Sequence, residues 1–235
     1  GKILEKTGDV RLYKYCLKFV SSYGTSREHD AQFLLNSIGR SKRSEFLEFW
    51  KTQKHPEADF YVLRGAITVR WSAMINLIIE RGNIAKRQRN FRRGRIIDQT
   101  LTTCGKYGDV ITLSRIHALG DYASAFKWPW YIYKEAARHG QVGMMAYIDG
   151  YYHSNPESDK HRNWGGYQHG DAMNSVMNEP FTESSVRVMS YLMSEGLSLR
   201  DVLNRASGSG DPRWLAHYAQ DLKPSYSDVD WDEIL

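Results

Sequence analysis

The stretch YIYKEAARHGQVGMMAYIDGYY, residues 131–152, decides the expected fold, because its pattern recurs along the chain. A short segment ending in two alanines runs into Gly140. Met144 and Met145 follow as an apolar pair, and Ile148 comes three residues after them. This spacing places one apolar stripe on a helix, which a neighbouring element must bury. The stretch therefore predicts a helix, a tight turn and a second helix.

Copies of this pattern return with a mean spacing of about 34 residues. We call the residue that matches Gly140 in each copy the turn residue. Periods of this size indicate stacked structural units, each of which buries the apolar face of its neighbour. The turn residues fall at Gly8, Lys42, Arg70, Gly108, Gly140, a position near Ser184, and Gly210.

The residues around the turn predict how the two helices of a copy end and begin. Glycine adopts the left-handed conformation that commonly ends a helix. Aspartate directly after it is a good N-cap for the next helix. Three copies contain both residues, at Gly8-Asp9, Gly108-Asp109 and Gly210-Asp211. The first helix of each copy also ends in small residues, among them Cys104 and Ala136, which allow close packing.

The segments AARHGQV, TCGKYGDV and ASGSGDP resemble the turn region of the ankyrin repeat family. The resemblance covers about residues 8–222, and its irregular texture resembles arrays from large DNA viruses. It implies an all-α solenoid of about six irregular ankyrin-like helix pairs that binds a protein partner. The family's T-P-L-H opening and G-A-D-V-N finger are absent. The period also fits tetratricopeptide repeats, although their W-x-x-L-G-x-x-Y pattern is missing. A non-repetitive all-α domain is the remaining alternative.

Two long spacings predict insertions in the array of residues 1–222, at 83–94 and 152–171. Insertions in repeat arrays lie in loops on one face, often the binding face. The first matched element, 8–20, corresponds to a second helix, so we expect its partner helix to precede it. Residues 223–235 form an acidic C-terminal tail.

Positive charge is concentrated in KRQRNFRRGR, residues 86–95, which has six cations and no acid. The whole chain of 235 residues has a formal net charge of +5, so the remainder is nearly neutral. Guanidinium groups bind phosphates and carboxylates through paired hydrogen bonds. An acidic protein surface, nucleic acid, the chain's own acidic tail and solvent alone are all compatible with this segment. The candidate binding residues are Lys86, Arg87, Arg89, Phe91, Arg92, Arg93 and Arg95.

Four aromatic residues are further binding candidates, because tryptophan and tyrosine are enriched at interface hot spots. Trp128 and Trp130 precede or begin a predicted first helix, whereas Trp164 and Tyr167 lie in the second insertion. The alternative for the first two is packing between units. The alternative for the last two is folding of the insertion back onto the array.

No catalytic or metal-binding pattern appears in the sequence. It lacks the phosphate-binding loop, the dinucleotide fingerprint, the nucleophile elbow and the H-E-x-x-H zinc motif. His153, His161 and His169 are spaced unlike any zinc site, so we expect no metal and no cofactor. Cys104 occupies a small-residue position of a first helix, which favours core packing over nucleophilic catalysis. We therefore expect no enzymatic activity.

Composition and cysteine content limit the remaining classes. Hydrophobic residues make up 41% and charged residues 25%, which is typical of a globular protein. No apolar run approaches the ~18–20 residues of a membrane span, so we expect no membrane association. Two cysteines suit a reducing compartment, so we expect an intracellular protein of the cytoplasm or nucleus.

The sequence thus favours a non-enzymatic protein–protein interaction scaffold whose partner has an acidic surface. The first alternative is a nucleic-acid-binding module that uses residues 86–95. The second is a structural subunit of a larger assembly, viral in the case of the arrays it resembles, held by its acidic tail.

Overall fold

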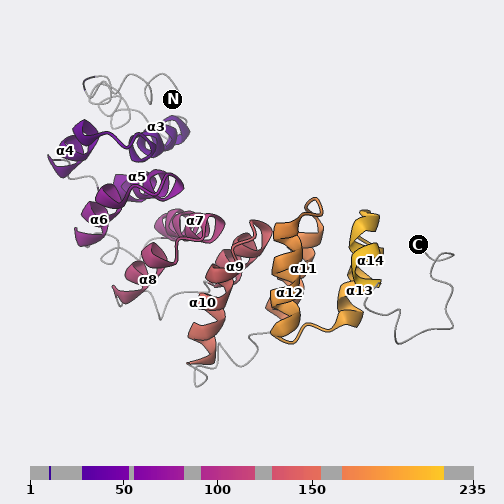
Figure 1. Cartoon of the computed structure of the whole chain (residues 1–235). Coiled ribbons are helices and arrows are strands. Elements are labelled where there is room, and N and C mark those ends of the chain that lie inside the picture. The colour runs from indigo at the N-terminus through magenta and orange to yellow at the C-terminus, as the bar shows by residue number, and fades with distance from the viewer. Residues whose placement is uncertain are drawn as a thin grey trace, which may run out of the picture. The chain divides into compact units, whose positions relative to one another are not determined.

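The computed structural model describes residues 11, 28–52, 56–81, 91–119, 129–154 and 166–219 (Figure 1). Every regular element in these ranges is an α-helix, which confirms the prediction of an all-α protein. The helices are α3 to α14, and they follow one another as pairs joined by short turns. They belong to two compact units, Gly1–Trp128 and Pro129–Leu235.

The N-terminal unit contains three described helix pairs. The first helices pack against one another in chain order, α3 on α5 and α5 on α7. The second helices do the same, α4 on α6 and α6 on α8, so the unit has two layers of helices (Figure 1). The pairs are α3 (Glu28–Arg40) with α4 (Ser44–Thr52), α5 (Pro56–Thr68) with α6 (Ser72–Glu80), and α7 (Phe91–Tyr107) with α8 (Val110–Ala118).

The C-terminal unit repeats this arrangement in its described residues. Its first helices pack in the order α9, α11, α13, and its second helices α10 and α12 pack against each other. Helix α14 packs against its partner α13. The pairs are α9 (Pro129–Arg138) with α10 (Val142–His153), α11 (Gly166–Met177) with α12 (Glu183–Ser194), and α13 (Leu199–Ser207) with α14 (Pro212–Ala219).

The turn residues adopt the left-handed conformation in five of these six pairs. Gly108, Gly140 and Gly210 have φ values of 65°, 72° and 77°, as predicted. Lys42 and Arg70 both have φ of 53°, although neither is glycine. The weaker sequence matches at 42 and 70 therefore identified the same backbone turn as the glycine matches.

Hydrogen bonds fix these turns at both ends. At Arg70, Gly108 and Gly140 the next residue donates its backbone N–H to a carbonyl five residues earlier, which satisfies an orphan acceptor of the first helix. At Lys42 and Gly210 the next residue donates to a serine hydroxyl instead. Asp109 accepts the backbone N–H of Thr112 at 3.0 Å and caps α8 as predicted, whereas Asp9 lies outside the described residues. The backbone bonds are Trp71 to Ala66 (2.9 Å), Asp109 to Cys104 (3.0 Å) and Gln141 to Ala136 (2.8 Å).

The turn residue predicted near Ser184 is wrong. Helix α11 ends at Met177 and α12 begins at Glu183, with Thr182 as its extended N-cap. No residue of this connection, which contains Pro180, is left-handed. A capping box between Thr182 and Ser185 begins α12 instead.

The predicted insertions are shorter in the structure, because helices occupy parts of both. Helix α7 begins at Phe91, inside the insertion 83–94. Helices α10 and α11 enter the insertion 152–171 from its two ends, so that His169 is buried in α11 instead of lying in a loop. The other predicted segments, 8–20 except Arg11 and 223–235, lie outside the described residues.

The predicted apolar stripes and small-residue positions form the core. Met74, Ile75 and Ile78 of α6 are buried, as are the matching residues of α10. Cys104 and Ala136, at the ends of first helices, are both 0% exposed. Small side chains at these positions allow neighbouring first helices to approach closely.

Two glycines set the contact between α3 and α5. A Cβ atom on Gly39 would lie 2.0 Å from the carbonyl oxygen of Val62. A Cβ atom on Gly65 would lie 2.1 Å from the carbonyl oxygen of Asn36. Both obstacles are backbone atoms, so a side chain at either position requires the helices to separate.

We therefore expect Gly65→Ala to lower the free energy of unfolding by about 2–3 kcal/mol, because overpacking forces the backbone to shift. Urea unfolding followed by circular dichroism measures this change. Gly150→Ala in α10 is the matched control, since nothing lies within 4 Å of its Cβ position. This control should stabilise the protein by roughly 0.5–1 kcal/mol. A neutral Gly65→Ala variant would contradict the close contact.

Candidate functional site

Each turn between the first and second helices of the N-terminal unit exposes a cation. Lys42 and Arg70 are the turn residues of the first two pairs, and Lys106 lies two residues before the turn residue of the third. All three side chains belong to exposed residues. We call these three residues the cationic turns. Arg40 and Arg43 add further positive charge beside Lys42.

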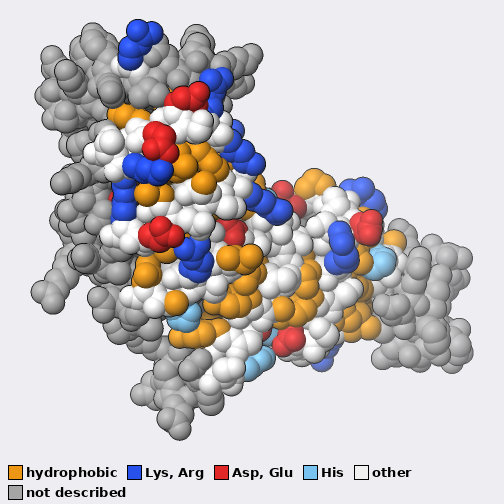
Figure 2. Space-filling model, turned by 60° about the vertical axis from the view of Figure 1, so that its left-hand side comes forward, with side chains coloured by type: hydrophobic (Ala, Val, Ile, Leu, Met, Phe, Trp, Pro, Cys, Tyr) orange, Lys and Arg blue, Asp and Glu red, His pale blue; other side chains and the backbone are white. Residues whose placement is uncertain are grey.

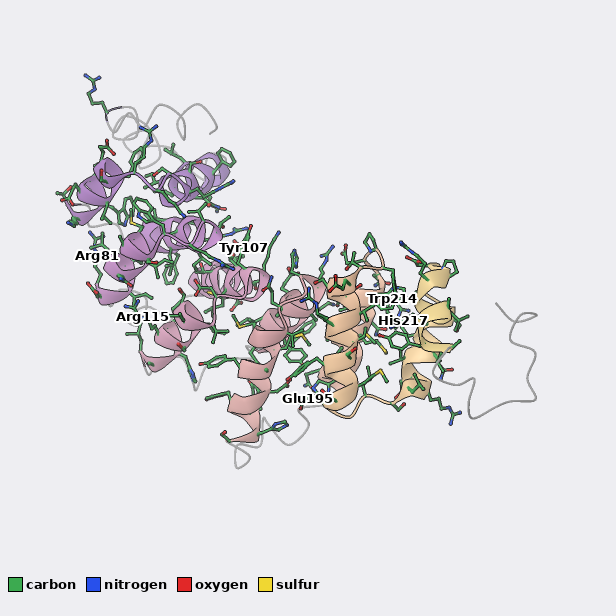
Figure 3. The ribbon with its side chains drawn as sticks, viewed as in Figure 1. Arg81, Tyr107, Arg115, Glu195, Trp214 and His217 are labelled. Atoms are coloured by element: carbon green, nitrogen blue, oxygen red, sulfur yellow. The ribbon has the colours of Figure 1, made fainter. Side chains whose placement is uncertain are left out.

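The cationic turns lie along one edge of the unit, because the carboxyl ends of its first helices are side by side. Gly39 and Gly65 bring the last turns of α3 and α5 into contact. Arg70 donates from Nη2 to the carbonyl oxygen of Tyr107 at 3.4 Å, and Tyr107 is the last residue of α7 (Figure 3). One cation is thus placed at the end of each of three neighbouring helices.

Backbone strain distinguishes Lys42 and Arg70 from ordinary surface cations. A residue with a side chain in the left-handed conformation costs roughly 1–2 kcal/mol relative to a right-handed one. Glycine avoids this cost and occupies the same position in three other turns. Strain of this kind persists at functional sites, where the side chain itself is needed. Their presence at these two positions therefore points to a role for the side chains.

Among the described residues, no carboxylate lies within ion-pair distance of Lys42, Arg70 or Lys106. In the C-terminal unit, two arginines beside the turns have acidic partners, whereas Arg205 donates to the side chain of Asn178. Arg138 pairs with Glu179, and Arg213 pairs with Asp211 at 2.7 Å. Hydrogen bonds from the Arg213 side chain hold the pKa of Asp211 at about 2. Figure 2 shows Lys and Arg side chains recurring over the surface of the N-terminal unit.

Arg81 shows how the fold uses a cation for stability instead. Its guanidinium contacts Asp59 at 3.3 Å and also donates to the carbonyl oxygen of Trp50 (Figure 3). The indole N–H of Trp50 donates to the same Asp59 oxygen at 2.8 Å. Asp59 is 0% exposed, so this network compensates a buried carboxylate and joins α4 and α5 to the end of α6.

A second buried carboxylate, Asp149, joins four helices of the C-terminal unit. Its Oδ2 accepts hydrogen bonds from the hydroxyls of Tyr133 at 2.8 Å and Tyr191 at 2.6 Å. Nε2 of His169 lies 3.5 Å from Oδ1, and the His169 ring stacks on Tyr133 with centroids 5.8 Å apart. Burial, the charge of Asp149 and its hydrogen bond all raise the pKa of Tyr133. Asp149, Tyr133 and His169 are buried and Tyr191 is half-buried, so the cluster has a structural role.

The predicted basic segment is only partly described. Its Lys86, Arg87 and Arg89 lie outside the described residues, whereas Phe91, Arg92, Arg93 and Arg95 begin helix α7, without a described side chain. The first turn of α7 has no acidic residue. Lys106 lies in the last turn of the same 17-residue helix. Arg92, Arg93 and Arg95 therefore lie near the start of α7 and Lys106 near its end, about 17–21 Å apart along its axis.

The predicted aromatic candidates are also only partly described. Trp128 and Trp164 lie outside the described residues, and only the backbone of Tyr167 is described, in α11. Trp130 is half-buried in α9, 4.1 Å from the ring of Tyr131. Tyr131, which the sequence analysis did not select, is 50% exposed. Which of two adjacent aromatic residues faces solvent depends on the phase of the helix, which the pattern did not resolve here.

Sequence reasoning also missed the cationic turns, although a signal for them was available. The repeat alignment already placed Lys42 and Arg70 at the turn residue, where other copies have glycine. A lysine and an arginine at a position that favours glycine indicate a side chain retained against strain.

Cys104 is not an activated nucleophile. Its side chain is fully buried at the end of α7, and this burial raises the pKa of the thiol well above its ordinary value. The thiol is therefore protonated at neutral pH, and its role is packing. The described residues also contain no group of three or more metal-ligating side chains.

Comparison with known proteins identifies no relative: no family model, curated protein or solved structure matches the chain. Among the described helices, none is long and apolar enough to cross a bilayer.

Replacing Lys42 by glycine should relieve the strain of its left-handed backbone and raise the free energy of unfolding by roughly 0.5–1 kcal/mol. Lys106→Gly removes the same charge from a regular helical position, so it should destabilise by a similar amount. Thermal unfolding of both variants measures whether each substitution stabilises or destabilises the protein. Destabilisation by Lys42→Gly would show that the lysine supports the turn.

Alkaline pH should unfold the C-terminal unit through Tyr133. The raised pKa keeps this phenol neutral in the folded state, whereas the unfolded chain ionises it near its ordinary value of 10. The contribution of Tyr133 to the free energy of unfolding is therefore complete below pH 10 and is lost as the pH rises above it. Well above pH 10, the free energy of unfolding should decrease less steeply with pH in Tyr133→Phe than in the unmodified protein, by about 1.4 kcal/mol per pH unit. Tyr131→Phe, which removes an exposed hydroxyl two residues away, should leave the slope unchanged.

Proposed function

We propose that this chain is a non-enzymatic scaffold of ankyrin-like helix pairs that binds a protein partner through the cationic turns. The observation that carries the proposal is that three adjacent turns each expose a cation without a described acidic partner. Two of these cations are held in a strained backbone conformation. The partner is expected to present an acidic surface, because carboxylates complement this edge.

The packing of the helix pairs supports a scaffold role. Stacked pairs contact only their neighbours and build an extended surface from equivalent positions. Close contact at Gly39 and Gly65, and the buried network around Asp59, hold the turns of the first two pairs at a fixed separation. A fixed row of charges selects a partner by spacing as well as by sign.

Electrostatics sets the strength and the salt dependence of this binding. Exposed ion pairs contribute about 0.2–1 kcal/mol each, so three of them give modest affinity. Their larger effect is on the rate of association, which falls as salt screens the charges. We therefore expect other contacts of the partner to supply the remaining affinity.

Nucleic acid bound by residues 86–95 is the second candidate, favoured by six cations in ten residues. The cationic turns do not extend that segment, because its Arg92, Arg93 and Arg95 begin α7, whereas Lys106 lies in the last turn of the same helix. Assembly of copies through the acidic tail 223–235 is a third candidate, since that tail has the chemistry of an acidic partner. The test therefore includes a nucleic acid and a peptide of residues 223–235 as ligands.

Charge reversal at the cationic turns tests the proposal. The variant combines Lys42→Glu, Arg70→Glu and Lys106→Glu, and the probe is immobilised poly-L-glutamate in biolayer interferometry. The control reverses three other exposed cations, Arg187, Arg200 and Lys51, of which Lys51 pairs with Glu48. Circular dichroism confirms that both variants fold.

We expect the unmodified protein and the control to bind poly-L-glutamate in low salt, and the turn variant to lose binding. Equal binding by the two variants would refute the assignment of the site. Binding of a single-stranded oligonucleotide without binding of poly-L-glutamate would favour the nucleic-acid candidate. Binding of a 223–235 peptide alone would favour assembly between copies.

A further inference from the structure

The chain itself contains an acidic segment whose charge is opposite to that of the cationic turns. We propose that the acidic tail of one molecule, residues 223–235, binds the cationic turns of a second copy, so that self-association and partner binding exclude each other. The inference rests on the proposed function, because it names a second ligand for the same site. Each copy contributes both surfaces, the tail and the turns.

The acidic tail carries an excess of negative charge. Its four acids lie within six residues, and Lys223 is its one base, so the tail has a net charge of −3. Acidic tails of this kind often act as interaction segments. Trp231 stands between two of the acids, and tryptophan is enriched at interface hot spots. The acids are Asp228, Asp230, Asp232 and Glu233.

Two arginines beside the turns of the C-terminal unit find their carboxylates within the chain. Arg138 pairs with Glu179, and Arg213 pairs with Asp211. In the described part of the chain, by contrast, no carboxylate lies within ion-pair distance of the cationic turns. The excess of cations at these turns and the excess of acids in the tail are therefore complementary, and such complementarity steers association.

The guanidinium of Arg70 is held in place without being neutralised. Its Nη2 donates to the carbonyl oxygen of Tyr107 at 3.4 Å, at the end of α7. A guanidinium has five N–H donors, so others remain for a carboxylate. Lys106 places its Nζ 5.8 Å from the centre of the Tyr107 ring. Two cations therefore lie beside the same aromatic residue, which suits a segment with acids on both sides of a tryptophan.

The tail and the cationic turns belong to different units of the chain, Pro129–Leu235 and Gly1–Trp128. A contact between two copies therefore joins unlike surfaces, and each pair of copies keeps one tail and one set of turns for further copies. Contacts of this heterologous kind form rings or open arrays instead of closed two-fold dimers. The inference thus predicts species larger than a dimer as the protein concentration rises.

The contact is expected to be weak and sensitive to salt, because exposed ion pairs contribute little each. We expect a dissociation constant on the order of 100 μM in low salt. At about 1 M sodium chloride the screening length is about 3 Å, so the copies should separate. Partner and tail use the same cations, so an excess of either displaces the other.

Exchange of charge between the two surfaces tests the contact by sedimentation velocity of the full chain. A turn variant and a tail variant each reverse three charges. We expect the unmodified protein to associate in low salt and either variant to remain monomeric. A chain with both sets of substitutions should associate again, because both surfaces have changed sign. The substitutions are Lys42→Glu, Arg70→Glu and Lys106→Glu in the turn variant, and Asp228→Lys, Asp230→Lys and Asp232→Lys in the tail variant.

Two controls exclude an effect of net charge alone. The chain with both sets of substitutions has the net charge of the unmodified protein. Reversal of Lys51, Arg187 and Arg200 to glutamate gives the net charge of the turn variant, and this control should still associate. Hexaglutamate in excess should dissociate the unmodified protein, whereas hexaserine should not. Circular dichroism confirms that every variant folds.

The outcomes separate this inference from the proposed function. A monomeric unmodified protein at every concentration in low salt would overturn the tail contact, and so would a monomeric chain with both sets of substitutions. Either result leaves the proposed function to be decided by poly-L-glutamate binding. Loss of association in the tail variant but not in the turn variant would overturn the assignment of the tail to the cationic turns. Association of the turn variant, together with its unchanged binding of poly-L-glutamate, would overturn both proposals.

Discussion

A left-handed residue at the end of the first helix is the constraint on which five of the six described helix pairs depend. It ends the helix and directs the chain into the second helix, and in three of these turns the residue that follows satisfies a free carbonyl of the first helix. Because the connection is short, the two helices of a pair lie against each other. Their apolar stripes then face the neighbouring pair. A longer connection, as between α11 and α12, needs a different solution, namely an extended segment and a capping box.

Buried carboxylates make the interior of each unit more specific than apolar packing alone. Asp59 in the N-terminal unit is compensated by an indole and a guanidinium, whereas Asp149 in the C-terminal unit is compensated by two phenols. Each network joins several helices through directional bonds. A change of helix register would leave a buried charge without donors, which is costly. These clusters therefore favour one packing arrangement within each unit.

The cations near the turns differ in whether they have an acidic partner. Arg138 and Arg213 of the C-terminal unit are paired with acids, whereas Lys42, Arg70 and Lys106 have no acidic partner among the described residues. Two of these three cations occupy positions where glycine is the unstrained residue. Arg70 also donates to the carbonyl oxygen of Tyr107, whereas the positive φ of Lys42 is a physical cost with no described ion pair beside it, which is the reason to propose a partner for this edge. The concentration of charge at residues 86–95 remains a separate feature of the sequence, and its described part begins α7.

The sequence by itself determined the helical class, most of the turns, and the side chains of the core. These features depend on local chemistry: glycine or a polar residue at the turn, aspartate at a cap, and apolar residues spaced by three or four. It did not determine that Gly39 and Gly65 meet, that Asp149 collects two distant tyrosines, or that Tyr131 is more exposed than Trp130. It also did not show that the first helices which end near Lys42, Arg70 and Lys106 are neighbours. Those facts arise only when helices far apart in the chain pack together, because distances between them depend on the shapes of both surfaces.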